Sequence, residues 1–410
     1  MMIKQFLYPS FSKILFSVVS ILFLMASLTA SYNSNINFEI ENRTINDIQF
    51  EAEIIFSEPE EIIFGTISTS AASPSGKVFL GDNGQKKIHV FDADGNYVDS
   101  FGREGSGPGE FQMIRKIITD DHQIHVFDVI HRMVHVFKQD NLRHVRSISL
   151  TGDASQPQAG RGAMMQRGST FPNDIHLLSN GDYMVTLQDF RNPDLLQSVI
   201  LSPDGKTVEE NRFEFRTQNE EVSSDNSGGS MRMVMNFPHS RNTKLSSSGS
   251  GLLFSNWNEN LEFTVFDESG NRLHSFSQPY TNAELNKQDV LAQLENMGGP
   301  GTQVAISGGA GGANMGEMRQ RMLQNMEIPD TWPAVDKIYA DKQNRLWVAA
   351  FTDKRHERKW FLFDEKGNKL AEFTWPSIKN IIHADGNTLF VQTVDEDELA
   401  QVIRYRFTLS

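Results

Sequence analysis

The chain has 410 residues, no cysteine and a formal net charge of −14 at pH 7. Without cysteine it can form no disulfide and must be stabilised by burial alone. The acidic balance argues against binding to a nucleic-acid backbone, which requires clustered lysine and arginine, and we expect no nucleic-acid partner.

The first 31 residues have the pattern of a secretory signal peptide. Lys4 and Lys13 precede an apolar run over 14–26, and small residues follow over 27–31. This run is shorter than the roughly 20 apolar residues that span a bilayer. We therefore predict that residues 1–31 direct export and are removed, which would place the protein in the periplasm or outside the cell with no stable membrane span. The alternative is an uncleaved N-terminal anchor.

The remainder, 32–410, repeats one short pattern. The plainest copy, 77–102, reads KVFLGDNGQKKIHVFDADGNYVDSFG, and the next, 124–150, reads IHVFDVIHRMVHVFKQDNLRHVRSISL. The alternation of apolar and polar residues predicts β-strands, and Asp94-Gly95 predicts a hairpin turn. One such antiparallel sheet cannot bury both of its faces alone, so copies must stack, and six usually close into a ring.

We therefore predict an all-β fold, a single six-bladed β-propeller of four-stranded antiparallel blades. The blades are expected over 66–102, 114–150, 171–215, 242–280, 334–376 and 377–410. The last blade lacks one strand, whereas the strand-like run 48–56 has no partner nearby in the sequence. An open outer edge would expose unpaired backbone groups, so we predict that 48–56 pairs with 401–409 and closes the ring.

The connection between the first two blades resembles that of NHL-repeat propellers. It reads FGREGSGPGEFQM over 101–113 and leads into IRKIITDD, while Asp82 and Asp128 end strands where those repeats also carry aspartate. The chain is similar to the secreted six-bladed propellers of this kind in Bacteroidetes-type bacteria, strongly over the first two blades and weakly over the others. This resemblance implies an extracytoplasmic binding scaffold and no particular activity. We expect Asp82 and Asp128 to bind turn amides.

Three long insertions, 151–170, 216–241 and 281–333, each join the last strand of one blade to the first strand of the next. They should therefore gather over one side of the channel mouth, where long loops are usually functional or disordered. A capping box, Thr281 with Glu284, predicts a helix over 282–296. The insertions are rich in methionine, and seven of these residues fall on one stripe of a helix or one face of a strand. They are Met315, Met318, Met322 and Met326 on the helix and Met231, Met233 and Met235 on the strand.

Three interpretations of these methionines are open. They can form the core of a lid that packs the insertions onto the ring. They can instead line an adaptable apolar groove for a peptide, a lipid or a partner helix, because unbranched thioethers re-pack around different shapes. The third is a Cu(I) site at 231–235, since thioethers suit soft ions, although only His239 lies nearby as a further ligand.

The mouth of the channel should carry a second set of polar residues. When the first strand of each blade is aligned on the turn that follows it, six residues occupy equivalent positions. They are Ser68, Arg115, Asp174, Thr243, Asp336 and Asn380. A lysine follows in three blades, namely Lys116, Lys244 and Lys337. Such a mouth suits a small polar ligand, but it is also what a water-filled channel needs to satisfy its backbone.

The sequence contains no local catalytic motif, and we expect no cofactor. His89, His125 and His135 recur at matching strand positions, which indicates the repeat pattern rather than a metal site. We therefore predict an exported binding protein that recognises a peptide, an envelope component or a partner protein through the Met-rich insertions. The alternative is a metal-assisted hydrolase or lyase that uses Asp174, Asp336, Arg115 and Asn380 at the mouth.

Overall fold

In the computed structural model, all of the described residues lie within one compact unit, Thr44–Ser410, and the remaining unit is Met1–Arg43. The described residues are 48–59, 62–150, 170–189, 192–218, 220–226, 229–286, 288, 290, 303–307 and 328–409. The expected signal segment 1–31, insertion 151–170 apart from Thr170, and Met315, Met318, Met322 and Met326 lie outside them.

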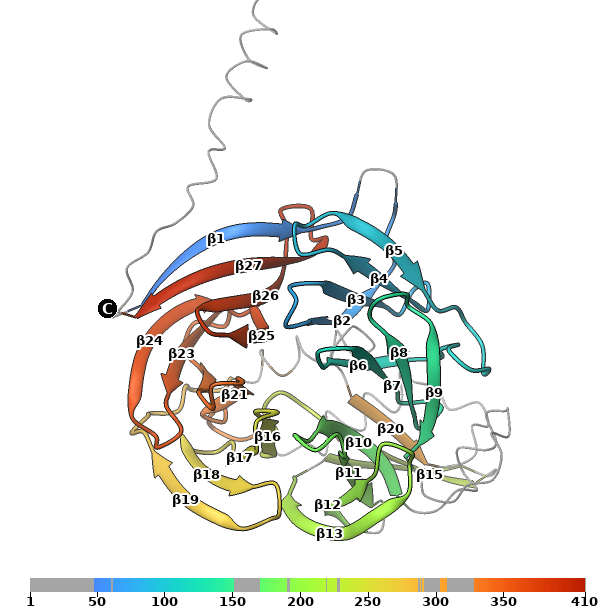
Figure 1. The fold of residues 1–410 in the computed structure, drawn as a ribbon. Helices are drawn as coiled ribbons and strands as arrows, with labels where there is room; N and C mark the ends of the chain where they lie inside the picture. Colours follow the sequence, from blue (N-terminus) through green and yellow to red (C-terminus); the bar gives the residue numbers. More distant parts are fainter. Residues whose placement is uncertain are drawn as a thin grey trace, which may run out of the picture. The chain divides into compact units, whose positions relative to one another are not determined.

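Within this unit, six four-stranded antiparallel sheets follow one another around a ring, which confirms the six-bladed propeller (Figure 1). Blade 1 consists of β2 (Ile67–Ala72), β3 (Val78–Asp82), β4 (Lys87–Phe91) and β5 (Tyr97–Phe101). Blade 2 consists of β6 (Ile114–Thr119), β7 (Gln123–Asp128), β8 (Met133–Lys138) and β9 (His144–Ser149). Blade 3 consists of β10 (Thr170–Leu177), β11 (Tyr183–Asp189), β12 (Asn192–Leu201) and β13 (Thr207–Arg216).

The second half of the ring has the same plan. Blade 4 consists of β16 (Thr243–Ser247), β17 (Leu252–Trp257), β18 (Glu262–Asp267) and β19 (Arg272–Ser277). Blade 5 consists of β21 (Val335–Ala340), β22 (Leu346–Phe351), β23 (Glu357–Phe363) and β24 (Lys369–Pro376). Blade 6 consists of β25 (Asn380–Asp385), β26 (Thr388–Val394), β27 (Ala400–Leu409) and the N-terminal strand β1 (Ile48–Phe56).

Apolar residues on the faces of neighbouring blades form the core. All six residues of β22 are buried, and they alternate between the two sides of the sheet. Trp347 and Ala349 belong to a cluster shared with blade 6, whereas Leu346 and Val348 belong to one shared with blade 4. A strand buried on both faces reads as a continuous apolar run, and burial of this surface stabilises the stack of blades.

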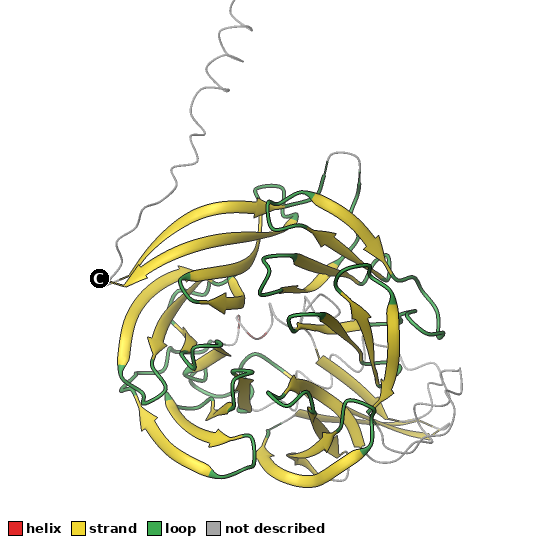
Figure 2. Ribbon diagram, viewed as in Figure 1, coloured by secondary structure: helices red, strands yellow, loops and turns green. Residues whose placement is uncertain are grey.

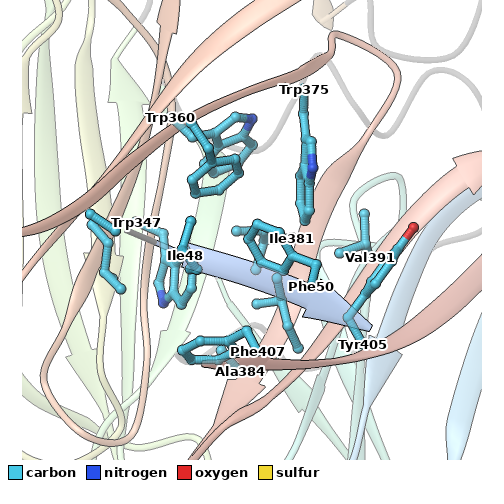
Figure 3. Close-up of a cluster of buried hydrophobic side chains, with 14 of the residues drawn as sticks. Ile48, Phe50, Trp347, Trp360, Trp375, Ile381, Ala384, Val391, Tyr405 and Phe407 are labelled. Carbon is cyan, nitrogen blue, oxygen red and sulfur yellow. The ribbon is translucent and has the colours of Figure 1, made fainter. Parts of the chain in front are cut away.

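The N-terminal strand completes blade 6 in the manner expected from the sequence. β1 runs antiparallel to β27, with Ile48 opposite Leu409 and Phe56 opposite Val402. Phe50 lies inside a cluster of large aromatic side chains from blades 5 and 6 (Figure 3). The first described strand of the chain therefore supplies both the outer edge and part of the core of the last blade.

A short turn recurs at the outer hairpin of blades 1, 4 and 5. In blade 5, Asp364 accepts a hydrogen bond from the backbone N–H of Asn368 at 2.8 Å, and Gly367 has a φ of 88°. Only glycine adopts such a φ without strain. A Cβ atom added at Gly367 would lie 2.2 Å from Cγ of Phe276 in blade 4, so this turn also contacts the neighbouring blade.

We expect Gly367→Ala to lower the free energy of unfolding by about 2–4 kcal/mol, since it combines a left-handed backbone penalty with overpacking. Gly386→Ala is the matched control, because Gly386 also has a positive φ, 56°, but has no atom within 4 Å of an added Cβ. It should cost only the backbone penalty, about 1–2 kcal/mol. Urea unfolding of both variants measures the difference, and equal losses would show that Phe276 moves aside freely.

The insertions differ from the expectation in two ways. Segments 216–241 and 281–333 share an additional antiparallel sheet of β14 (Glu220–Asn226), β15 (Gly229–Asn236) and β20 (Gln303–Ser307). The prediction that a helix begins at residue 282 is wrong, because Glu284 forms an isolated antiparallel bridge with Thr331. Pairing with a distant segment overrides the local capping signal here. In the described part of the chain, strands and loops make up almost the whole structure (Figure 2).

Candidate functional site

The innermost strand of each blade carries one of the six residues predicted for the channel mouth. These strands are β2, β6, β10, β16, β21 and β25, and they face the centre of the ring (Figure 1). In blades 1, 2 and 5 a β-bulge falls on the predicted residue, namely Ser68, Arg115 and Asp336. A bulge adds one unpaired residue and re-aims the side chains beside it.

The bulges correct the alignment of two positions. In blade 3 the bulge falls on Asn173, so Asp174 corresponds to Lys116 and Lys337 rather than to Arg115 and Asp336. In blade 6 the bulge falls on Ile382, two residues after Asn380. The six residues therefore do not form one level ring. Aligning the strands on their following turns could not detect this, because the position of a bulge is set by pairing with the next strand.

Two of the six side chains hold the backbone. Ser68 Oγ accepts a hydrogen bond from Asn83 Nδ2 at 2.6 Å, and it lies 3.4 Å from the carbonyl oxygen of Ile114 in the next blade. Thr243 Oγ1 donates to the carbonyl oxygen of Arg216 at 2.8 Å. Both side chains therefore connect neighbouring segments of the backbone. Their hydroxyl groups are already engaged in hydrogen bonds, so they are not available to a ligand.

Asp174 is part of a charged cluster between blades 2 and 3. Lys116 Nζ lies 2.9 Å from its Oδ1 and donates to the carbonyl oxygen of Ile175 at 2.8 Å, while His176 Nε2 lies 3.5 Å from its Oδ2. Burial alone would raise the pKa of Asp174, but Lys116 and His176 bring it below its usual value. Arg115 is also close enough for its charge to interact with Asp174.

Asp336 is the centre of a second cluster, between blades 4 and 5. Arg358, which is not among the residues predicted for the mouth, donates from Nε to Oδ2 of Asp336 at 2.8 Å. Burial opposes ionisation, but Lys337, Arg358 and Lys244 lower the pKa of Asp336 below its usual value. Burial lowers the pKa of the Lys244 ammonium, an effect that Asp336 opposes and Lys337 reinforces.

These two clusters limit the chemistry of the mouth. Both Asp174 and Asp336 are ionised at neutral pH and paired with cations, whereas a carboxylate pair for acid–base catalysis needs pKa values that are pushed apart. Arg115 and Lys244 form no ion pair within 4 Å with any carboxylate of the described residues. The arrangement suits electrostatic contact with a bound anionic group better than proton transfer.

The two aspartates that end strands β3 and β7 act on turn amides, as expected. Asp82 accepts backbone hydrogen bonds from Gly65 at 2.6 Å and from Thr66 at 2.9 Å. Asp128 accepts one from Gln112 at 2.7 Å. Each carboxylate thereby joins a turn of its blade to the connection that enters the same blade.

The bases of the two insertions that share a sheet lie together around blade 4. Thr217 bridges Asn242 at the base of the first, and Glu284 bridges Thr331 at the base of the second. Arg241 links them, since it forms an ion pair with Glu259 and donates from Nη2 to Thr331 Oγ1 at 3.2 Å.

An aromatic stack joins the second base to the Asp336 cluster. The rings of Trp332 and Phe351 stack with centroids 4.8 Å apart, and the Arg358 guanidinium lies 4.3 Å from the centroid of Phe351. Arg358 is the residue paired with Asp336. A continuous series of contacts therefore connects the bases of the two insertions to the Asp336 cluster at the channel mouth.

Among the described residues, no helix is both long and apolar enough to cross a bilayer. A family model described as a 6-bladed beta-propeller matches residues 33–156, which include the first two blades. No curated protein matches the sequence.

Several solved structures resemble most of the chain at low identity. A protein of Bacteroides fragilis described as exported has 11% identity and a TM-score of 0.49, over 90% of this chain and 98% of that one. A member of the duf4221 family from Bacteroides vulgatus has 12% identity and a TM-score of 0.45, over 90% and 100% of the two chains. Virginiamycin B lyase from Staphylococcus aureus has 13% identity and a TM-score of 0.41, over 89% and 100%.

Proposed function

We propose that this protein is an exported β-propeller that binds a peptide, an envelope component or a partner protein through the sheet formed by its Met-rich insertions. The observation that supports this proposal most directly is the pairing of β15 with β20. Met235 lies opposite Val304 and Met233 lies opposite Ile306, although the two strands come from different insertions. Two insertions that are separate in the sequence therefore form one sheet. This sheet offers a larger surface than a loop that only connects two blades.

The register of this sheet separates apolar from polar positions. Opposite residues in an antiparallel pair share a face, and alternate residues along a strand point to opposite faces. One face therefore carries mainly apolar positions, and the other carries mainly polar ones. The apolar positions are Met231, Met233, Met235, Val222, Val304 and Ile306, and the same face also includes Glu220 and Ser224. The opposite face includes Arg232, Val234, Glu221, Ser223, Ala305 and Ser307.

A face of this composition suits a ligand with an apolar stretch. Methionine is a residue type whose unbranched, polarizable side chain adapts to partners of different shape. The sheet also has two outer strands, β14 and β20, each paired on one side only within the described residues. An extended peptide can add to such an edge through main-chain hydrogen bonds, which is a common mode of peptide recognition. We therefore favour an extended, partly apolar peptide among the ligand classes.

The test separates a binding face from a lid core. Peptides are selected from a random phage-displayed library on the unmodified protein and then titrated against two variants. In the first, Met231, Met233 and Met235 are each replaced by glutamine. In the second, the matched control, Arg232 and Val234 on the opposite face are replaced by glutamine.

We expect the methionine variant to lose affinity for the selected peptides by at least about tenfold, which is 1.4 kcal/mol, while its Tm stays within a few degrees of the parent. The control should bind as the parent does. If the methionine variant instead loses stability strongly, the face packs as a lid core. Unchanged peptide binding would also contradict the proposal.

A further inference from the structure

Three side chains with metal-binding atoms converge at the turn between β7 and β8 in blade 2. They are Asp128 at the end of β7, His131 in the turn and His135 on β8, and one ligand atom of each lies within 4.8 Å of the others. In the part of the chain that the structure describes, no other group of three such side chains comes together in this way. Asp128 and His135 are almost fully buried, and His131 is partly exposed.

Backbone groups hold the Asp128 carboxylate in place. Its Oδ1 accepts hydrogen bonds from the backbone N–H groups of Ile130 at 3.1 Å and His131 at 3.2 Å. Its Oδ2 accepts one from Gln112 and lies 2.9 Å from His131 Nδ1. The other ring nitrogen of His131, Nε2, lies 3.2 Å from Ser106 Oγ. Both residues are therefore oriented by a second layer of contacts, as metal ligands usually are.

A hydrogen bond engages one of the two ring nitrogens of His135. Its Nδ1 lies 2.8 Å from Ser147 Oγ, and Ser147 Oγ also lies 2.9 Å from Nε2 of His144. When Nδ1 donates to Ser147, the neutral imidazole keeps an unprotonated lone pair at Nε2, which is the form that binds a metal ion.

That lone pair has no hydrogen-bond partner. Nε2 of His135 is buried without a donor or an acceptor, beside the Asp128 carboxylate. The buried Nε2 atoms of His176 and His383 also lack partners. Neither of them, however, belongs to a cluster that holds both a carboxylate and a second imidazole within the described residues. An unsatisfied buried acceptor costs free energy, so its persistence at such a cluster calls for an explanation.

Blade 1 provides an internal comparison. Asp82 and His89 occupy the positions of Asp128 and His135, and Gln85 occupies the position of His131. There, His89 Nε2 lies 3.2 Å from Asp82 Oδ2 and is satisfied by it. In blade 2, the additional imidazole of His131 takes this oxygen instead. The substitution of glutamine by histidine thus converts a closed pair into a set of three potential ligands.

We infer that Asp128 Oδ2, His131 Nδ1 and His135 Nε2 form a binding site for a divalent transition-metal ion of the kind that prefers imidazole, with Zn²⁺ as the best fit. Zinc bonds of about 2.0–2.1 Å at tetrahedral angles place ligand atoms about 3.3 Å apart. The pair Asp128 Oδ2 and His131 Nδ1 already approaches this spacing. Two neutral imidazoles and one carboxylate leave a fourth position for water.

The test is calorimetric titration of Zn²⁺ into the purified protein, without a histidine tag and after removal of metal with EDTA. We expect one Zn²⁺ per chain with a Kd below about 1 μM, and a higher Tm in its presence. His131→Gln, which reproduces the arrangement of blade 1, should weaken this binding by on the order of 100-fold. Its Tm without metal should stay near that of the parent, because blade 1 tolerates the same residue.

A matched control and a second ion make the result decisive. His122 is exposed and lies outside the cluster, so His122→Gln should leave the titration unchanged. Co²⁺ bound at the site should give visible absorption bands that are present in the parent and absent in His131→Gln. The inference is overturned if Zn²⁺ binds no more tightly to the parent than to His131→Gln, or if His122→Gln is the variant that loses binding.

Discussion

Replacing Phe50 by alanine is expected to lower the free energy of unfolding by about 3–5 kcal/mol. Phe50 is buried between blades 5 and 6, with ring centroids 4.7 Å from Trp375 and 4.9 Å from Phe373. Its removal leaves a cavity among large rigid rings that cannot collapse easily (Figure 3). The loss also weakens β1, the strand that closes the ring. Urea unfolding followed by tryptophan fluorescence measures this effect, since Trp375 lies in the same cluster.

Gln49→Ala provides the control for this prediction. Gln49 lies next to Phe50 on the same strand, but its side chain is exposed. Surface substitutions of this kind usually change stability by no more than about 0.5 kcal/mol. A loss below 1 kcal/mol for Phe50→Ala would contradict a closure in which β1 contributes to the core. We also expect Phe50→Ala to aggregate more readily on warming, because release of β1 exposes the edge of β27.

The second large effect is a loss of stability between about pH 6.5 and pH 4. Burial lowers the pKa of His135, His176 and His383 to about 4 in the folded protein. In the unfolded chain these groups titrate near pH 6.5. Above that pH both states are neutral and the stability is fully present. As the pH falls, these histidines bind protons in the unfolded state but stay neutral in the folded state, so unfolding becomes more favourable.

The expected slope is large because three groups act together. Each proton contributes about 1.4 kcal/mol per pH unit, so the free energy of unfolding should fall by up to about 4 kcal/mol per pH unit near pH 5. His131 acts in the opposite direction, since Asp128 raises its pKa. The depressed carboxyl groups, such as Asp120 with a pKa of about 2, contribute only at lower pH.

The measurement is a series of urea titrations from pH 7.5 to pH 4.5 in the presence of EDTA, so that bound metal does not contribute. His383→Gln should reduce the slope by about one third, because one of the three histidines is removed. This variant is suitable since Nε2 of His383 has no hydrogen-bond partner to lose. A stability that is constant between pH 6.5 and pH 5 would show that these histidines become protonated in the folded protein.

The two groups of methionines show which features of the insertions can be predicted from the sequence and which cannot. Their alternation at 231–235 correctly indicated a strand, which is β15. Its pairing with β20 was not foreseen, because the two strands lie in different insertions and no local signal connects them. The capping box at Thr281 and Glu284 predicts a wrong helix start for the same reason, since Glu284 pairs with the distant Thr331. The proposed role of 315–326 lies outside the described residues.

In the candidate metal site, by contrast, the residues that come together are neighbours in the sequence. Asp128, His131 and His135 are close in the sequence, but histidines at repeated strand positions indicate the blade pattern rather than a metal site. The signal that could have found the site is the single difference between the two blades, Gln85 against His131. Only the side-chain geometry shows that Nε2 of His135 has no hydrogen-bond partner in blade 2.

The sequence by itself determined the six blades, their hairpin turns and the identity of the strand that closes the ring. These features depend on residues that are neighbours in the chain, because strand alternation and turn geometry repeat with a short period. The tertiary structure decided the position of each bulge, the ion pairs of Asp174 and Asp336, and the joining of two insertions into one sheet. Each of these depends on contacts between segments far apart in the sequence, whose relative placement follows only from the packing of the whole ring.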